Sequence, residues 1–397
     1  MCIRLPIFEE LSKEQDAVYN LNPLNKNLVV GPPGTGKSIV ALHLASRLTR
    51  DSTMLVKGRS QVKLVMYSTL LKIWTNSAVG ESELEFDASN VDSFHHWFNN
   101  WYQFSVGQNI PKIQGNNQVS TEQSDSLKTE FQDYDWDQIV QRISETEEDL
   151  LPIHKVDLII DEGQDLPSDF YIATNSMTRS LTVFADDNQS LRERNTQTEN
   201  IREYCSIENE NKFVLKKNYR NSLEVAKVAA RFYSGLDTGI PEMPDRIGGF
   251  SPSLHQFNKR EEEWAHITRY LKNNPQKQIG VFLPNYYLVD ELHSYVRRNT
   301  KSNVQKYRNV FGEVQDVDPC KPGLLLTYLD NAKGLEFDTV FVPSLDKWTQ
   351  SVDNSSKMRL YVLASRARND LTFSWSGDGE PSILSIFPHD LLPLQRH

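Results

Sequence analysis

The stretch that most constrains the fold of this chain runs from Asn27 to Val40, with the sequence NLVVGPPGTGKSIV. A short apolar segment leads into a loop of the pattern G-x-x-x-x-G-K-[ST], and a helical pattern follows to about Arg50. Such a loop surrounds a phosphate chain with backbone N–H groups at a helix N-terminus. A Gly/Pro cluster alone would indicate only a turn. The apolar segment before it and the helix after it favour a nucleoside triphosphate site.

The residues of this loop have distinct expected roles. The backbone cradle for the phosphates comprises Gly31, Pro32, Gly34, Thr35 and Gly36. Its glycines let the backbone approach the ligand without an intervening Cβ. We expect the Lys37 ammonium to reach the β- and γ-phosphates of ATP and the Ser38 hydroxyl to hold Mg²⁺.

Length and composition bound the class of protein. At 397 residues the chain is too long for one ordinary domain, so we expect two or three hydrophobic cores. The mean hydropathy is −0.53, and no run approaches the ~18 apolar residues of a membrane span. The N-terminus lacks the apolar run of a signal peptide. Cys2, Cys205 and Cys320 lie far apart, a spacing typical of neither zinc nor redox sites. We expect a reduced, cytoplasmic protein without a membrane segment.

The charge balance neither supports nor excludes a nucleic-acid partner. The formal net charge is −10, which by itself disfavours polyanions. However, the segment 121–150 alone carries ten acids against two bases, so the rest of the chain is close to neutral. Several bases could contact phosphates or simply form solvated faces. They are Lys216, Lys217, Arg297, Arg298, Lys301 and Lys306.

Two carboxylates follow the apolar segment 156–160, where the sequence continues as Asp161-Glu162-Gly163-Gln164-Asp165. Ligands of parallel α/β sheets bind beyond the carboxyl ends of the strands. We therefore expect Asp161 to be a Mg²⁺ ligand and Glu162 to orient or deprotonate the attacking water. The segment 181–185 repeats the change from apolar strand to polar loop. Together these elements predict a parallel, doubly wound α/β sheet.

A second unit is expected to begin near Cys205. The sequence around Phe213 leads there into an amphipathic helix that ends near Tyr233. Predicted strands of this unit cover 279–283, 324–327, 338–342 and 370–374, and predicted helices cover 261–271 and 287–298. In the first unit, the aromatic segment 91–102 is more typical of a core than of a binding surface.

Seven segments, taken in order, resemble the motifs of the UvrD/Rep-like helicases of superfamily 1. They are Leu11–Gln15 (the Q motif), Gly31–Ser38 (motif I), Asp161–Asp165 (motif II), Ala185–Ser190 (motif III), Asn218–Arg220 (motif IV), Lys333–Asp338 (motif V) and Tyr361–Arg368 (motif VI). Their order and spacing match the family over nearly the whole chain.

The resemblance implies two RecA-like P-loop domains with ATP in the cleft between them. The first would cover 1–204, with a reduced insertion at about 75–155, and the second would cover 205–397 without the family's large 2B insertion. Under the resemblance, Gln15 contacts adenine, Tyr219 stacks on the base and Glu336 holds the ribose. It also implies that three side chains reach the γ-phosphate, namely Gln189, Arg220 and Arg366.

The chain departs from the family where single-stranded bases are usually held. Arg192 and Arg194 stand where stacking Tyr and Trp are expected, and Asp330 stands where motif V has a His. Base–aromatic stacking contributes about 1–3 kcal/mol per base, so this loss would weaken the grip on a strand. Arginine could instead stack or bind phosphate.

Two functional hypotheses remain. The first is an ATP-dependent 3′–5′ DNA helicase or translocase acting on single-stranded or partly duplex DNA. The second is a nucleic-acid-responsive ATPase switch that regulates a partner protein such as a nuclease, without processive unwinding. A P-loop kinase would leave Lys333–Asp338 and Arg366 unexplained. DNA and RNA are not distinguished, and repair, replication and anti-phage defence all use such motors.

Overall fold

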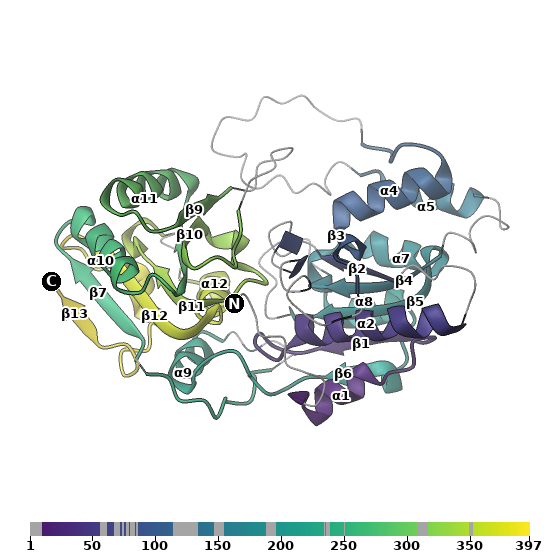
Figure 1. The fold of residues 1–397 in the computed structure, drawn as a ribbon, viewed down its shortest axis with the longest axis horizontal. Coiled ribbons are helices and arrows are strands. Elements are labelled where there is room, and N and C mark those ends of the chain that lie inside the picture. Colours follow the sequence, from purple (N-terminus) through teal and green to yellow (C-terminus); the bar gives the residue numbers. More distant parts are fainter. Residues whose placement is uncertain are drawn as a thin grey trace.

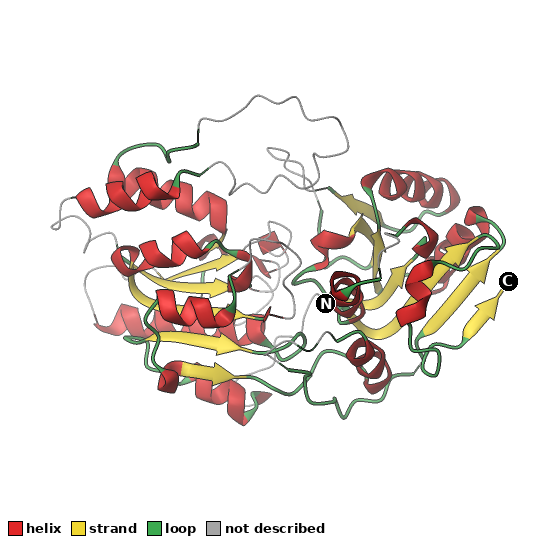
Figure 2. Cartoon of the chain, turned by 180° about the vertical axis from the view of Figure 1, so that it is seen from behind, coloured by secondary structure: helices red, strands yellow, loops and turns green. Residues whose placement is uncertain are grey.

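The computed structural model contains two parallel β-sheets that lie side by side, each covered by helices (Figures 1 and 2). It describes residues 10–55, 62–66, 72–73, 75–76, 79, 84, 86–113, 134–146, 155–187, 196–233, 235, 239–249, 251–308, 317–348 and 352–397. Every strand pairing within the two sheets is parallel. This architecture is consistent with two RecA-like domains and confirms the predicted fold class.

The first sheet has six strands in the order β3-β2-β4-β5-β1-β6. They are β1 (Lys26–Val30), β2 (Val62–Met66), β3 (Val91–Ser93), β4 (Val156–Asp161), β5 (Thr178–Ala185) and β6 (Lys212–Val214). Its helices are α1 (Lys13–Tyr19), α2 (Lys37–Leu55), α4 (Phe94–Val106), α5 (Trp136–Glu145), α7 (Ser168–Met177) and α8 (Thr198–Tyr204). Strand β1 lies between β5 and β6, and β5 pairs with β4, so the loop after β1 lies at the same edge of the sheet as the ends of β4 and β5.

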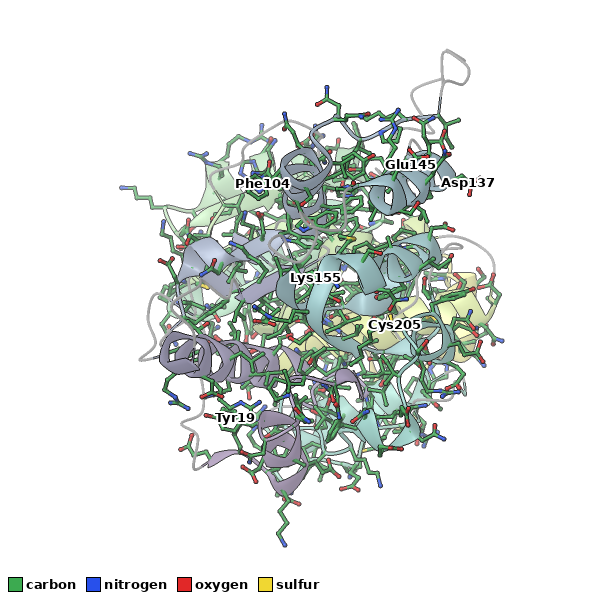
Figure 3. All side chains as sticks on the ribbon, turned by 90° about the vertical axis from the view of Figure 1, so that its right-hand side faces the viewer. Tyr19, Phe104, Asp137, Glu145, Lys155 and Cys205 are labelled. Carbon is green, nitrogen blue, oxygen red and sulfur yellow. The ribbon has the colours of Figure 1, made fainter. Side chains whose placement is uncertain are left out.

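Alternating side chains of β1 explain why this sheet is covered on both faces. Leu28 and Val30 belong to the core beneath α4, α5, α7 and α8, whereas Val29 belongs to the core beneath α1 and α2. A strand buried on both faces is typical of parallel sheets. Figure 3 shows Phe104 of α4 and Tyr19 of α1 far apart, because α4 packs against β2 and β3 while α1 packs against β6.

Two edge strands correct the sequence interpretation. Strand β6 lies beyond residue 205 and yet pairs with β1, so the assignment of Phe213 and Val214 to the second unit is wrong. Strand β3 lies within the predicted insertion at 75–155 and pairs with β2. The aromatic segment that follows β3 forms α4, whose Phe94, Phe98 and Tyr102 are fully buried, as expected of core residues. The domain boundary as such stays a prediction.

The second sheet has seven strands in the order β13-β7-β12-β11-β8-β10-β9. They are β7 (Ser253–Phe257), β8 (Gln278–Leu283), β9 (Val304–Tyr307), β10 (Gly323–Tyr328), β11 (Phe337–Val342), β12 (Ala367–Ser376) and β13 (Leu394–Arg396). Its helices are α9 (Leu223–Arg231), α10 (Arg260–Asn273), α11 (Tyr286–Asn299) and α12 (Asn354–Ala364). The four predicted strands and two predicted helices of this unit are confirmed, and β7, β9 and β13 were missed.

The structure also bears on the expectations about membrane segments and cysteines. No helix among the described residues is long and apolar enough to cross a membrane. Cys205 is a buried free thiol, but Cys320 takes part in a disulfide, although its spacing predicted no pairing. The partner of Cys320 lies outside the described residues.

Candidate functional site

The loop between β1 and α2 lies at the carboxyl edge of the first sheet and requires glycine at two positions. Gly34 and Gly36 have φ of +86° and +87°, a region that L side chains rarely adopt. A Cβ on Gly34 would lie 2.4 Å from the Asn218 Oδ1 atom, and a Cβ on Gly36 would lie 2.5 Å from the Gln15 Nε2 atom. The loop is therefore held between α1 and the Asn218 segment.

The Lys37 ammonium lies inside this loop and is buried. It donates to the carbonyl oxygens of Gly31 at 2.5 Å and Pro32 at 3.3 Å, and lies 3.5 Å from the Asp186 carboxylate. The Thr35 hydroxyl also donates to the Pro32 carbonyl, at 2.9 Å. A buried ammonium surrounded mainly by backbone carbonyls is well placed to bind a phosphate chain.

Gln15 uses its amide to hold the loop. Its Nε2 donates to the Thr35 carbonyl at 3.0 Å, and its Oε1 accepts from the backbone N–H of Ser12 at 3.0 Å. The latter bond completes the capping box of α1. The expected contact between Gln15 and adenine stays a prediction.

The acidic pair Asp161-Glu162 lies at the carboxyl end of β4, whose last residue is Asp161, at the same edge of the sheet as the loop. Asp161 is fully buried. Its Oδ1 accepts from the Glu162 backbone N–H at 3.1 Å, while no described group donates a hydrogen bond of ordinary geometry to its Oδ2. A buried carboxylate oxygen without a donor is costly. It suits a ligand that the protein itself does not supply, such as a cation.

Glu162 is positioned by an unusual backbone and by a residue that the sequence interpretation did not single out. Its φ and ψ are 57° and 43°, left-handed values that are uncommon outside glycine and cluster at functional sites. The Gln164 Nε2 donates to the Glu162 carboxylate at 2.7 Å, and the Gln164 Oε1 accepts from the Asp186 N–H at 2.9 Å. Gln164 therefore links the ends of β4 and β5.

The two carboxyls have pKa values displaced in opposite directions. Burial and the neighbouring charge of Glu162 raise the pKa of Asp161 to about 6, against the opposing effects of Ser38 and Lys37. Burial also raises the pKa of Glu162, but Lys37 and the Gln164 hydrogen bond outweigh it, so that this pKa lies below its ordinary value. Glu162 is thus an ionised, oriented carboxylate that can accept a proton.

Arginines from two other segments lie near this site: Arg220 lies between β6 and α9, and Arg366 and Arg368 lie at the amino end of β12. Arg220 lies beside the loop, because a Cβ on Gly34 would be only 3.3 Å from the Arg220 Cβ. Its Nε donates to Glu336 Oε2 at 2.6 Å, and Arg368 donates to Glu336 Oε1 from Nε at 3.1 Å and from Nη2 at 2.6 Å. These arginines hold the pKa of Glu336 at about 2, despite its burial. The sequence interpretation did not assign a role to Arg368.

Arg366 is almost completely buried, at 1% exposure. Its guanidinium donates to the Val362 carbonyl at 3.0 Å, to the Leu335 carbonyl at 3.3 Å and to the Ser365 hydroxyl at 3.1 Å. Burial, followed by the charge of Arg220, lowers the pKa of Arg366 to about 9. Its positive charge is in turn one of the effects that lower the pKa of Glu162.

An ion pair that we did not predict joins the two units. The Lys333 Nζ lies 2.6 Å from the Asp165 Oδ1, and both side chains are buried. Burial nonetheless raises the pKa of Asp165 to about 6. Tyr219 provides another connection, since its N–H donates to the Gly34 carbonyl at 2.8 Å. Its side chain is 46% exposed, which leaves room for a stacked base.

Other expected residues are placed differently or not described. Gln189, Arg192 and Arg194 lie outside the described residues, as does the side chain of Asp330. Of the bases considered as phosphate contacts, Lys217 pairs with Asp245 at 2.6 Å and Lys306 pairs with Asp290 at 2.7 Å. These two are therefore partly neutralised.

The arrangement fits a magnesium-bound triphosphate. Ser38 and the unpartnered oxygen of Asp161 could hold Mg²⁺, which usually keeps several waters and needs only one or two protein ligands. Accordingly, no cluster of three or more His, Cys, Asp or Glu side chains with metal-binding geometry occurs among the described residues. The glycine loop and Lys37 could hold the phosphates, and Arg220 and Arg366 could approach from the opposite side.

Comparisons with known proteins give little further guidance. No family model matches the chain, and no curated protein matches it. Solved structures do match, among them the C-terminal domain of a possible DNA helicase from Lactobacillus plantarun WCFS1. The sequence identity to that domain is 19% and the TM-score is 0.34, over 44% of this chain and 98% of that one.

Proposed function

We propose that the chain hydrolyses ATP in the cleft between its two sheets and uses the cycle to move 3′ to 5′ along single-stranded or partly duplex DNA. The observation that carries the ATPase part is the meeting of three elements. The glycine loop with Lys37, the Asp161-Glu162 pair and the buried Arg366 come from different parts of the chain. Lys37 lies 3.5 Å from Asp186, and Gln164 connects Asp186 to Glu162. The Lys333–Asp165 ion pair joins the two units. Movement on DNA rests on the resemblance in seven ordered motifs.

In this proposal, Lys37 binds the β- and γ-phosphates, and Ser38 and Asp161 hold Mg²⁺. When bound, the metal neutralises charge that develops on the phosphate oxygens. Glu162 orients the attacking water and accepts its proton. Arg366 adds positive charge from the second sheet, an effect worth roughly 10³–10⁵ in rate at finger-type sites. Because Arg366 and Glu162 belong to different sheets, hydrolysis depends on how the sheets are held together.

The deciding experiment measures steady-state ATP hydrolysis with and without single-stranded DNA, with Lys37→Ala as the blank. We expect a tenfold or greater stimulation by DNA at modest salt, and a strand-displacement assay would then test unwinding. The same assay with RNA distinguishes the two nucleic acids. Absence of any Lys37-dependent hydrolysis would sink the proposal as a whole.

One observation favours the ATPase switch as a second candidate. The two arginines that bind Glu336 already have a counterion in that carboxylate, and Arg192 and Arg194 replace the usual stacking aromatics. Hydrolysis that vanishes in Lys37→Ala but ignores both DNA and RNA would support this candidate. A partner such as a nuclease would then supply the trigger, and sedimentation of native extract should show the chain in a complex.

A further inference from the structure

Glu336 contacts two arginines and carries no other described hydrogen bond. Its Oε2 accepts from Arg220 and its Oε1 accepts twice from Arg368. The three side chains are 13–20% exposed, so the network is largely shielded from water. Charge-assisted pairs of this kind are strong and directional, especially where arginine presents two donors. Both oxygens of Glu336 are thus already engaged by protein groups.

The guanidinium of Arg220, by contrast, has a hydrogen-bond donor without an acceptor. Its Nε binds Glu336, whereas its Nη1 is buried and has no hydrogen-bond partner among the described residues. A buried donor without an acceptor is destabilising, and more so when it is charged. The Arg220 Cβ lies beside Gly34 of the phosphate loop, so the unused donor belongs to a side chain that starts at the candidate phosphate site.

Arg368 is fixed in turn by its own neighbours. Its Nη1 lies 3.4 Å from both the Gln278 Oε1 and the Asp338 Oδ1. The Arg246 Nη2 donates to the backbone carbonyls of Arg220 and Arg368, at 2.6 Å and 2.7 Å. Arg246 therefore ties together the two segments whose side chains meet at Glu336.

We propose that Glu336 is a positioning residue for Arg220, held in place by Arg368, and that it leaves the buried Nη1 of Arg220 to bind the terminal phosphate of a nucleoside triphosphate. This inference rests on the proposed function and deepens it. It assigns Glu336 a role in sensing the number of phosphates, in place of the ribose contact that the family resemblance implies.

The two roles predict different ligand selectivity. A residue that positions Arg220 affects only ligands that carry a γ-phosphate. A residue that holds the ribose affects ADP and ATP alike. The test measures the Kd of a fluorescent ADP analogue and of the matching non-hydrolysable triphosphate, both with Mg²⁺, for the wild-type chain and for Glu336→Gln. We expect the triphosphate to bind about ten- to hundredfold more weakly to the variant, the range for a lost hydrogen bond to a charged group, with ADP affinity unchanged.

Two variants at Arg368 keep the test decisive if Glu336→Gln folds poorly, and a double variant adds a test if it folds well. Arg368→Gln should show the same selective loss to a smaller degree, and Arg368→Lys should restore it only in part because lysine lacks the bidentate fork. The double variant Arg220→Gln/Glu336→Gln should bind the triphosphate no more weakly than Arg220→Gln alone, since the carboxylate acts through that arginine.

The outcomes are distinguishable. Parallel losses for ADP and triphosphate, additive losses in the double variant, or unchanged binding in both Glu336→Gln and Arg368→Gln would each overturn this inference while leaving the proposed ATPase intact. Failure of the wild-type chain to bind either nucleotide would instead overturn the proposed function.

Discussion

The two sheet edges at the candidate site differ in how their buried charges are balanced. At the first edge, buried acids lack sufficient counterions: Asp161 has an unpartnered oxygen and a pKa raised to about 6. At the second edge, the acid is paired with two cations: Glu336 accepts hydrogen bonds from Arg220 and Arg368, whose charges lower its pKa to about 2. The acid of the first edge thus has an oxygen that lacks a partner within the described residues, whereas the acid of the second edge is paired, and among these three paired side chains only the Nη1 donor of Arg220 is left without an acceptor.

This difference separates residues whose removal should affect chemistry from those whose removal should affect the fold. A site that keeps unsatisfied charge sacrifices stability for binding. A network whose members satisfy each other contributes to the stability of the folded chain and loses that contribution when one member is removed. Variants at the two edges therefore test whether hydrolysis depends mainly on the first edge and stability mainly on the second.

The largest effect on hydrolysis that leaves the fold intact is expected at Glu162. Glu162→Gln removes the proton acceptor but keeps the shape and the contact with Gln164, so hydrolysis should fall about 10²–10⁴-fold while nucleotide binding persists. Steady-state hydrolysis and a nucleotide-binding titration measure the two properties separately. Glu145→Gln, at an exposed position of α5, is the matched control. An equal loss of binding and turnover would mean that Glu162 holds the ligand instead.

Arg366→Ala should give the next largest effect, this time on the fold. The substitution empties a buried site, removes three hydrogen bonds and leaves Glu162, Asp186 and Glu336 with less positive charge nearby. The free energy of unfolding should fall by about 3–5 kcal/mol, as measured by urea denaturation without nucleotide. Arg231→Ala breaks an exposed pair with Asp390 and should cost less than about 1 kcal/mol. Similar losses in both variants would contradict the stabilising role of the second edge.

The same contrast explains what the sequence could predict. The glycine loop and the Asp161-Glu162 pair were found because each is a local pattern next to a strongly apolar strand. The missed strands β7, β9 and β13 read SLHQF, VQKY and LQR, and two of them form the edges of their sheet. Edge strands are often short and polar, which protects their unpaired backbone groups from pairing with another chain, so they give little of the apolar signal on which strand prediction depends.

The network of Arg220, Glu336 and Arg368 could not be predicted from local sequence patterns, for a different reason. Arg220 and Glu336 are 116 positions apart, and Lys333 and Asp165 are 168 apart. Contacts over such separations give no repeating pattern in the sequence, because only the packing of the folded chain brings these residues together. The resemblance supplied the motif residues but gave no role to Arg368, Gln164 or the Lys333–Asp165 pair, whose importance rests on contacts.

A pH-dependent effect is expected at Glu263 of α10, a buried acid far from the unsatisfied edge. It accepts from the Ser344 N–H at 2.9 Å and from the Ser374 hydroxyl at 2.6 Å, yet burial raises its pKa to about 7 from an ordinary 4.5. The folded chain therefore holds this proton more tightly than the unfolded chain. Its contribution to the free energy of unfolding is present below pH 4.5 and is lost as the pH rises through 7.

Over that range the loss should amount to about 3 kcal/mol as an upper value, and Glu263→Gln should remove it. Urea denaturation of both chains at several pH values between 5 and 8 gives the difference directly. Parallel pH profiles for the wild-type chain and the variant would show that Glu263 ionises as easily in the folded chain as in the unfolded one.

The smallest effect is expected at Asp161, and its sign is the sharpest test of the first edge. Asp161→Asn removes a buried charge whose Oδ2 has no described donor, so the chain without ligand should gain about 1–2 kcal/mol in the free energy of unfolding at pH 7.5. The same change should abolish stabilisation by Mg²⁺ with nucleotide, because the oxygen that would hold the metal is replaced by an amide. Glu263→Gln is the matched control, since it also neutralises a buried acid but should leave that ligand effect intact. A loss of stability in Asp161→Asn without ligand would mean that the carboxylate is satisfied within the protein, and the contrast between the two edges would no longer hold.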